Sequence, residues 1–139
     1  MLIAFPFIFP PAPLNEKASN AGVVIVNTRF REDTVGQDAG HWGRGRLKIY
    51  RDTVGDLVLE LQEDFEVGPG SNFWLYLNTR AGVEEEKDFN ADKGRIKVAK
   101  IKSFTGSQVY VLDKSDYAKA KAITIWCESF GQYIASADI

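Results

Sequence analysis

Alternation of apolar and polar residues with a period of two is the dominant pattern along this chain. It is clearest over residues 46–50 and 57–62, where leucine or isoleucine occupies every second position. Each segment therefore has the form of a strand with one face in a core and the other in solvent. Turn-forming residues 51–56, RDTVGD, lie between the two segments and predict an antiparallel hairpin.

Two further segments predict strands of different character. Residues 23–30, VVIVNTRF, are rich in β-branched side chains, which favour strands. Residues 73–77, FWLYL, are apolar on both faces, which is typical of a central strand that is covered on each side. Shorter strands are expected in the segments GRIKV, QVYVL and AITIWCESF, at residues 94–98, 108–112 and 122–130.

Only residues 113–122, DKSDYAKAKA, have a helical pattern, with Asp113 or Ser115 available as the N-cap. Glycine-containing turns separate the predicted strands along the rest of the chain. The sequence therefore predicts a mainly β fold. We expect an antiparallel β-sandwich or partly closed barrel, with one short helix before the penultimate strand.

The first residues differ from the rest of the chain. Residues 1–9 are apolar except for the interruption at Pro6, and further prolines at positions 10, 11 and 13 favour extended backbone. This apolar run is shorter than the about 20 residues that span a bilayer, and no basic region precedes it. We expect residues 1–19 to be an apolar, proline-rich tether or arm, or the remnant of a membrane anchor. Residues 20–139 are expected to form a single β domain.

Composition and charge narrow the possible partners. The apolar fraction of 45% and the charged fraction of 26% are ordinary for a globular domain. With 17 basic and 19 acidic residues, the net charge of -2 gives no general attraction to nucleic acid, so we expect no nucleic-acid partner. The single cysteine excludes an intramolecular disulfide, so cysteine usage does not indicate a compartment.

The sequence favours a non-catalytic protein over an enzyme. A nucleophilic triad would depend on His41, the only histidine, and no nucleophile-elbow motif is present. His41 is expected to be a loop or strand-entry residue. A closed zinc site would combine His41 and Cys127 with two carboxylates, which is a minority ligand set. We therefore predict no metal-ligand cluster and no nucleotide-binding motif.

The segment DFNADKG, residues 88–94, offers an alternative metal site. Asp88, Asn90 and Asp92 stand at alternate positions, as the oxygen ligands of a calcium loop do. Gly94 comes one residue late for that motif, however, and Ala99 occupies the position of the bidentate glutamate. The simpler interpretation is a polar connecting loop.

The C-terminal residues 94–139 carry a resemblance to a known family. A glycine and lysine strand comes first, followed by a G-x-Q-x-Y turn and strand, a short polar helix, a W-C-x-x-F signature and a final small-residue strand. These features fall on Gly94 and Lys97, on Gly106, Gln108 and Tyr110, on residues 113–122, on Ile125, Trp126, Cys127 and Phe130, and on residues 135–139. The segment resembles the C-terminal half of the DM-thirteen domain family, also labelled an electron-transfer domain. The likeness continues upstream through HWGRGRLKIY and LVLEL, so it covers roughly residues 20–139.

The resemblance implies a compact β domain of the cell envelope, periplasmic or extracellular, that is often anchored to a membrane; a cytoplasmic location is the alternative. It implies that Cys127 is the redox candidate, with Trp126, Phe130, Tyr110 and Gln108 as possible supporting residues. Haem or another redox centre is compatible with this resemblance, although the sequence requires no cofactor. The partner would be another envelope or redox protein.

The residues around Cys127 leave its role open. Cys127 shares a strand face with Ile123 and Ile125, whereas Trp126 belongs to the opposite face. A thiol within an apolar face is inert, whereas a redox cysteine needs solvent access and a cation that activates it. The side chains of Arg44, Arg46 and Lys97 could supply that cation if the fold brings them close to Cys127.

Three functions therefore remain, and a hydrolase is the third and least supported of them. The first is an accessory electron-transfer module with Cys127 as its reactive group. The second is an adhesion or matrix- or protein-binding module in which Cys127 is an inert core residue. In that alternative, exposed aromatic residues such as Trp42, Trp126 and Tyr133 would recognise the partner.

Overall fold

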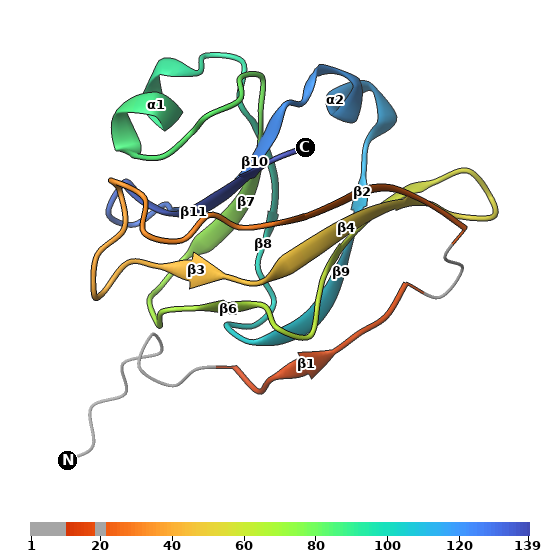
Figure 1. Cartoon of the computed structure of the whole chain (residues 1–139), viewed down its shortest axis with the longest axis horizontal. Coiled ribbons are helices and arrows are strands. Elements are labelled where there is room, and N and C mark those ends of the chain that lie inside the picture. Colours follow the sequence, from red (N-terminus) through yellow and green to blue (C-terminus); the bar gives the residue numbers. More distant parts are fainter. Residues whose placement is uncertain (1–10, 19–21) are drawn as a thin grey trace.

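Two sheets face each other and enclose the main apolar core in the computed structural model, which describes residues 11–18 and 22–139 (Figure 1). The larger sheet has the order β1-β9-β5-β4-β2 and contains β1 (Leu14–Asn15), β9 (Gly106–Leu112), β5 (Leu57–Leu61), β4 (Arg46–Arg51) and β2 (Val23–Arg29). The second sheet has the order β11-β10-β7-β8 and contains β11 (Gln132–Asp138), β10 (Ala122–Cys127), β7 (Phe73–Asn78) and β8 (Ile96–Lys100).

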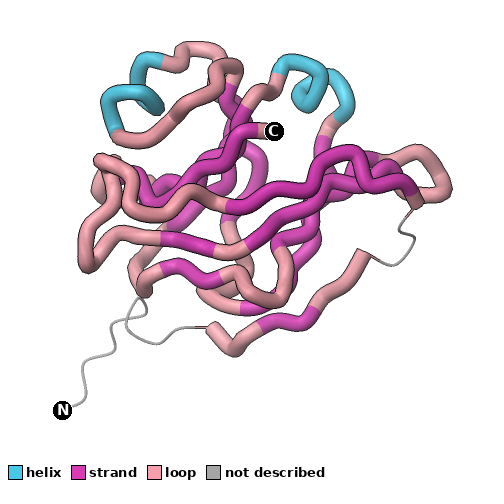
Figure 2. The backbone as a smooth tube through the Cα atoms, in the orientation of Figure 1, coloured by secondary structure: helices cyan, strands magenta, loops and turns pink. Residues whose placement is uncertain are grey.

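A short ribbon of β3 (Gly43–Arg44) and β6 (Glu66–Val67) and two helices, α1 (Glu86–Ala91) and α2 (Lys114–Lys119), complete the described elements. Among the strands that the structure describes, every pair is antiparallel except β1 with β9. Strands make up far more of the backbone than helices do, as Figure 2 shows. The structure thus confirms the mainly β, antiparallel sandwich, and its sheets do not close into a barrel.

The predicted hairpin is formed by β4 and β5. Leu47 lies opposite Leu61, and Ile49 lies opposite Leu59, so the apolar residues of both strands enter the main core together. The expectation that β5 is half-buried was wrong, because all five of its residues are buried. The outer face of β5 is covered at Glu60, which accepts hydrogen bonds from the Ala18 backbone N–H at 2.7 Å and from the Gln62 side chain at 2.7 Å.

Strand β7 is central in its sheet, as its two apolar faces predict, because it pairs with β10 on one side and β8 on the other. Its inner residues belong to the main core between the sheets. Tyr76 belongs to a second apolar cluster on the outer face of the same sheet, together with Val83, Phe89, Trp126 and Tyr133. The chain therefore has a core on each side of β7.

The expectation of one helix was incomplete, because α1 forms where the sequence predicted a polar loop. Glu86 and Asp88 stand in its first turn, where the positive end of the helix dipole stabilises carboxylates. Phe89 is the buried residue of α1 and anchors the helix to the second cluster. Helix α2 follows its prediction, with the Asp113 side chain accepting a hydrogen bond from the Asp116 N–H at 2.9 Å.

Part of the expected N-terminal tether is attached to the domain. Residues 1–10 lie outside the described residues, but β1 pairs in parallel with β9, and the Ser103 hydroxyl donates to the Ala12 carbonyl at 2.8 Å. The Glu16 carboxylate accepts from the Val109 N–H at 3.0 Å. Within the described ranges, no helix has the length and apolar character needed to cross a membrane.

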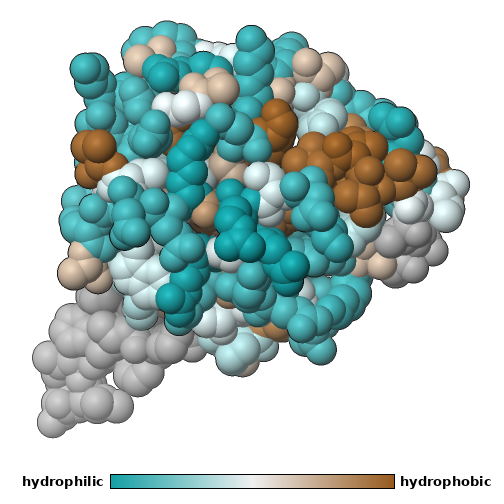
Figure 3. Space-filling view, in the orientation of Figure 1, coloured by the Kyte–Doolittle hydropathy of each residue, from teal (hydrophilic) through white to brown (hydrophobic). Residues whose placement is uncertain are grey.

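The surface is mostly polar in the view of Figure 3, apart from an apolar patch on the side where the β4–β5 hairpin projects. Val23, Val24 and Val54 are among the exposed apolar residues of the structure.

Candidate functional site

Cys127 is the last residue of β10 and is 2% exposed. Its side chain lies in the main core with those of Ile123 and Ile125, as the period of the strand predicts. The thiol donates a hydrogen bond to the Ser71 carbonyl oxygen, with 3.3 Å between Sγ and O. Ser71 belongs to the partly exposed loop 68–72, so one polar contact links the core thiol to a surface loop.

The basic side chains expected near Cys127 are engaged in other ion pairs. Arg44 contacts Glu66 at 2.6 Å, Arg46 contacts Asp64 at 3.2 Å, and Lys97 contacts Glu128 at 3.8 Å. A thiolate beside the Ser71 carbonyl would lose the hydrogen bond that the protonated thiol donates. The thiol therefore has a backbone acceptor, while these three cations pair with carboxylates.

Trp126 and Tyr133 are buried, so their expected role as exposed recognition residues was wrong. Trp126 is 5% exposed because Phe89 of α1 stacks on its indole, with ring centroids 3.8 Å apart. Tyr133 is fully buried, and its hydroxyl lies 2.8 Å from the Ser136 hydroxyl. Helix α1 and the segment that precedes it cover the face of the sheet that the strand pattern left open.

Gln108 and Tyr110 form a buried pair in the larger sheet. The Tyr110 hydroxyl donates to the Gln108 side-chain oxygen at 2.6 Å, and the Lys102 N–H donates to the Tyr110 hydroxyl at 2.9 Å. Burial raises the pKa of Tyr110. The hydrogen bonds of this pair hold Lys102 and Ser103 against β9 and do not include Cys127. Phe130 is 73% exposed in the turn between β10 and β11.

The residues of the calcium alternative support the helix and the turn after it. Asp88 accepts from the Glu84 N–H at 3.0 Å and lies 3.7 Å from Arg80, while Asn90 is exposed. Asp92 caps the end of α1. No group of three or more acidic, histidine or cysteine side chains is arranged to hold a metal ion in the part of the chain that the structure describes.

Asp92 belongs to a buried polar network that the sequence did not reveal. Its carboxylate accepts hydrogen bonds from the Thr79 backbone N–H at 2.8 Å, from the Thr79 hydroxyl, and from the Asn78 amide at 3.2 Å. The Thr124 hydroxyl in turn donates to the Asn78 side-chain oxygen at 2.6 Å. Burial alone would raise the pKa of Asp92, but the hydrogen bonds that it accepts outweigh burial and hold this pKa below its usual value.

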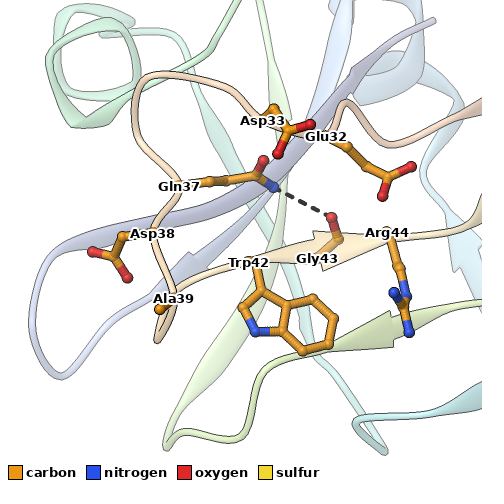
Figure 4. Close-up of a pocket in the computed structure, with 8 residues that line it drawn as sticks. All are labelled: Glu32, Asp33, Gln37, Asp38, Ala39, Trp42, Gly43 and Arg44. Atoms are coloured by element: carbon orange, nitrogen blue, oxygen red, sulfur yellow. Dashed lines mark hydrogen bonds between the residues drawn. The ribbon is translucent and has the colours of Figure 1, made fainter.

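A surface pocket of about 360 Å³ lies beside Trp42 (Figure 4). Its lining residues are Glu32, Asp33, Gln37, Asp38, Ala39, Trp42, Gly43 and Arg44. Figure 4 shows the carboxylates of Glu32 and Asp33 on one side and the indole of Trp42 on the other, with Gln37 between them. Of these residues, the sequence indicated Trp42 for recognition and Arg44 only as a possible neighbour of Cys127. The others form no sequence motif that would indicate a site.

Hydrogen bonds fix the position of Gln37 in the pocket lining. The Gln37 side-chain nitrogen lies within hydrogen-bond distance of the carbonyl oxygens of Arg31, Gly43 and Ile134, at 3.3, 3.2 and 3.0 Å. His41 is a loop residue, as expected, and its Nδ1 lies 2.9 Å from the Asp38 carboxylate. Asp38 also accepts from the Gly40 N–H at 2.8 Å. These contacts attach the loop 32–42 to β11 and order it around the pocket.

The fold and the position of Cys127 define an open β-sandwich domain with a buried thiol at the end of its penultimate strand. The family model described as Electron transfer DM13 matches residues 34–139, which is more than half of the chain, and the chain belongs to this family. The match confirms the resemblance stated from the sequence. No curated protein and no solved structure matched the chain.

Proposed function

We propose that this chain is an accessory electron-transfer domain of the cell envelope in which Cys127 is the redox-active group. The family match supports this proposal, because the matched range includes Cys127. The usual setting of the family supports the proposed envelope location. The proposed partners are envelope or redox proteins that carry a disulfide or a dithiol.

The chemistry that a single cysteine can perform is thiol–disulfide exchange. The Cys127 thiol loses its proton and attacks one sulfur of an oxidised partner; a mixed disulfide forms as the partner's S–S bond breaks, and the leaving sulfur takes up a proton. A reduced dithiol partner then attacks the Cys127 sulfur of the mixed disulfide and releases the first partner as a dithiol. The second thiol of this dithiol partner then attacks the partner's own sulfur in the new mixed disulfide. The bond to Cys127 breaks, the partner's disulfide closes, and Cys127 is released as a free thiol. Two electrons thereby pass from the second partner to the first.

Haem does not fit the residues around Cys127. The thiol lies in the main core against a backbone carbonyl. Cys127 lines neither the pocket beside Trp42 nor a second pocket, which lies between the β4–β5 turn and α2 and is lined by Arg51, Leu57 and Tyr117 among others. His41, which could serve as an axial ligand, contacts Asp38 in another loop. The proposal therefore places the redox chemistry on the thiol itself.

Exchange requires movement of the loop 68–72, because the closed structure buries the thiol. Asn72 holds this loop: its side-chain oxygen accepts from the Trp74 indole at 2.8 Å, and its carbonyl accepts from the Glu128 N–H at 3.0 Å. Asn72 has a φ of +60°, a conformation that glycine adopts without strain. Opening at this loop costs less than global unfolding, because it breaks few contacts.

Mass spectrometry of the protein incubated with oxidised glutathione tests the proposal. Asn72→Gly removes the contact with Trp74 and should accelerate formation of the mixed disulfide, whereas Asp33→Gly, at another residue with positive φ, should not. Cys127→Ser should abolish the product. If the exchange rate instead follows global unfolding in denaturant and is equal in both glycine variants, Cys127 is an inert core residue.

A binding module is the second candidate function, and the pocket beside Trp42 favours it. Since Trp126 and Tyr133 are buried, Trp42 is the remaining recognition residue of that hypothesis.

A further inference from the structure

We propose that the pocket beside Trp42 binds a saccharide ring that carries an amino group. This inference deepens the second candidate function and does not depend on the redox chemistry of Cys127. It rests on three features of the pocket: an aromatic wall, hydrogen-bonding groups on the facing side, and an excess of negative charge.

The aromatic wall is the half-buried indole of Trp42. Gly68 lies directly against this ring: a Cβ on Gly68 would stand 2.8 Å from the indole nitrogen, so the ring packs on bare backbone. The Arg44 guanidinium carbon is 5.3 Å from the ring centroid and is held there by its ion pair with Glu66. The part of the indole that Gly68 and Arg44 leave uncovered lines the pocket, and the C–H face of a sugar ring can pack against it.

The facing side supplies hydrogen-bond acceptors. Glu32 and Asp33 are exposed, and within residues 11–18 and 22–139 neither forms an ion pair. Asp38 is less available because Gly40 and His41 already contact its carboxylate. Carboxylates accept strong hydrogen bonds from hydroxyl and ammonium groups, and Arg44 can donate to a ring or hydroxyl oxygen.

The charged residues that line the pocket determine which class of sugar it favours. Glu32, Asp33 and Asp38 line the pocket against the one cation of Arg44, whose charge is balanced by Glu66. A protonated amino sugar gains attraction to the carboxylates of Glu32 and Asp33, a neutral sugar gains only hydrogen bonds, and a uronic acid is repelled. The pocket volume of about 360 Å³ lies within the usual range of ligand sites and suits one ring.

The loop is ordered before any ligand binds, which favours recognition. Gln37 fixes the loop 32–42 to the carbonyl oxygens of Arg31, Gly43 and Ile134. A site that is already ordered loses little conformational entropy when it binds a ligand.

The test is isothermal titration calorimetry of the full chain with three oligosaccharides: oligoglucosamine, cello-oligosaccharide and oligogalacturonate. We expect saturable binding that is tightest for oligoglucosamine and absent for oligogalacturonate. Trp42→Ala should weaken binding of both the amino and the neutral sugar about tenfold. The double variant Glu32→Gln, Asp33→Asn should remove the preference for the amino sugar and leave the neutral sugar little changed. Salt should reduce this preference in the wild type.

Matched controls separate the pocket from general surface effects. Phe130→Ala removes an exposed aromatic residue outside the pocket, and Glu84→Gln removes an exposed carboxylate outside it; neither should change affinity. The charge variants lie on the surface, so the test stands even if Trp42→Ala fails to fold. Absence of saturable binding in the wild type, equal binding of all three oligosaccharides, or equal losses in the control variants would overturn the inference. Each of these results leaves the glutathione exchange experiment on Cys127 unaffected.

Discussion

Phe89 stacks on Trp126 with 3.8 Å between ring centroids and 13° between ring planes. This contact joins helix α1 to β10 and buries the residue that precedes Cys127. Phe89 also meets Tyr76 edge to face, at 4.9 Å between centroids. The second core therefore depends on one side chain of a six-residue helix.

Phe89→Ala should lower the free energy of unfolding by about 3–5 kcal/mol, because it leaves a cavity among buried aromatic rings. Denaturant unfolding gives this value, and near-ultraviolet circular dichroism should show loss of the ordered Trp126 signal. Asn90→Ala, an exposed change on the same helix, is the control and should cost less than about 0.5 kcal/mol. If Phe89→Ala cost as little stability as Asn90→Ala, α1 would not hold the second core.

Cys127→Ala should cost about 1–2 kcal/mol, because it removes a buried sulfur and leaves the Ser71 carbonyl without its donor. In the wild type, a thiol reagent should modify Cys127 slowly in native buffer and rapidly in denaturant. Fast stoichiometric labelling of the folded wild-type protein would show that the loop 68–72 is already open in solution.

Asp92→Asn should destabilise the domain at neutral pH, since it removes the charge from an acceptor that binds Thr79, Asn78 and Gly94. The pKa of Asp92 is below its ordinary value of 3.8, so its stabilising contribution is present above that value and is lost as the pH falls through the lower folded pKa. The difference in unfolding free energy between wild type and variant should therefore shrink as the pH is lowered from 7 through this acidic range. A difference that is independent of pH would contradict the assigned charge effect.

The contribution of Tyr76 to stability should depend on alkaline pH, because its pKa is raised where that of Asp92 is lowered. Burial, followed by the hydrogen bond that its hydroxyl donates to Glu128, raises the pKa of Tyr76 from 10.0 to about 12. The protonated phenol therefore contributes stability below pH 10.0 that is lost as the pH rises toward about 12. Compared with Tyr76→Phe, the wild type should lose stability faster over this interval, and a spectrophotometric titration should show the late tyrosine. Identical alkaline profiles would contradict the raised pKa of Tyr76.

Gly106→Ala should release β1 from β9. Gly106 has a φ of +92°, and a Cβ there would lie 2.0 Å from the Leu14 carbonyl oxygen. Gly131→Ala is the matched control, because its φ of +61° is also strained but its nearest neighbour is 3.9 Å away. We expect about 1–2 kcal/mol of destabilisation from backbone strain in both variants. Only Gly106→Ala should also reduce the hydrogen-exchange protection of the backbone amides that pair β1 with β9.

Local patterns predicted the elements that depend on neighbouring residues in the chain. The period of two placed Leu47 and Ile49 in the core and assigned Cys127 to the face of Ile123 and Ile125. Asp113 was identified as a helix cap because a cap acts within one turn. The sequence motifs around Cys127 were sufficient to identify the family.

What covers the second face of a strand was decided only by the tertiary structure. The period of β10 separates Trp126 from Cys127 but does not reveal that α1 lies over Trp126, because Phe89 is 37 residues earlier in the chain. The contact of Asn78 with Asp92 and the pocket beside Trp42 arise in the same way, from side chains that are dispersed in sequence and joined by packing. Alternation in a strand specifies which residues share a face, whereas burial and reactivity depend on what packs against that face.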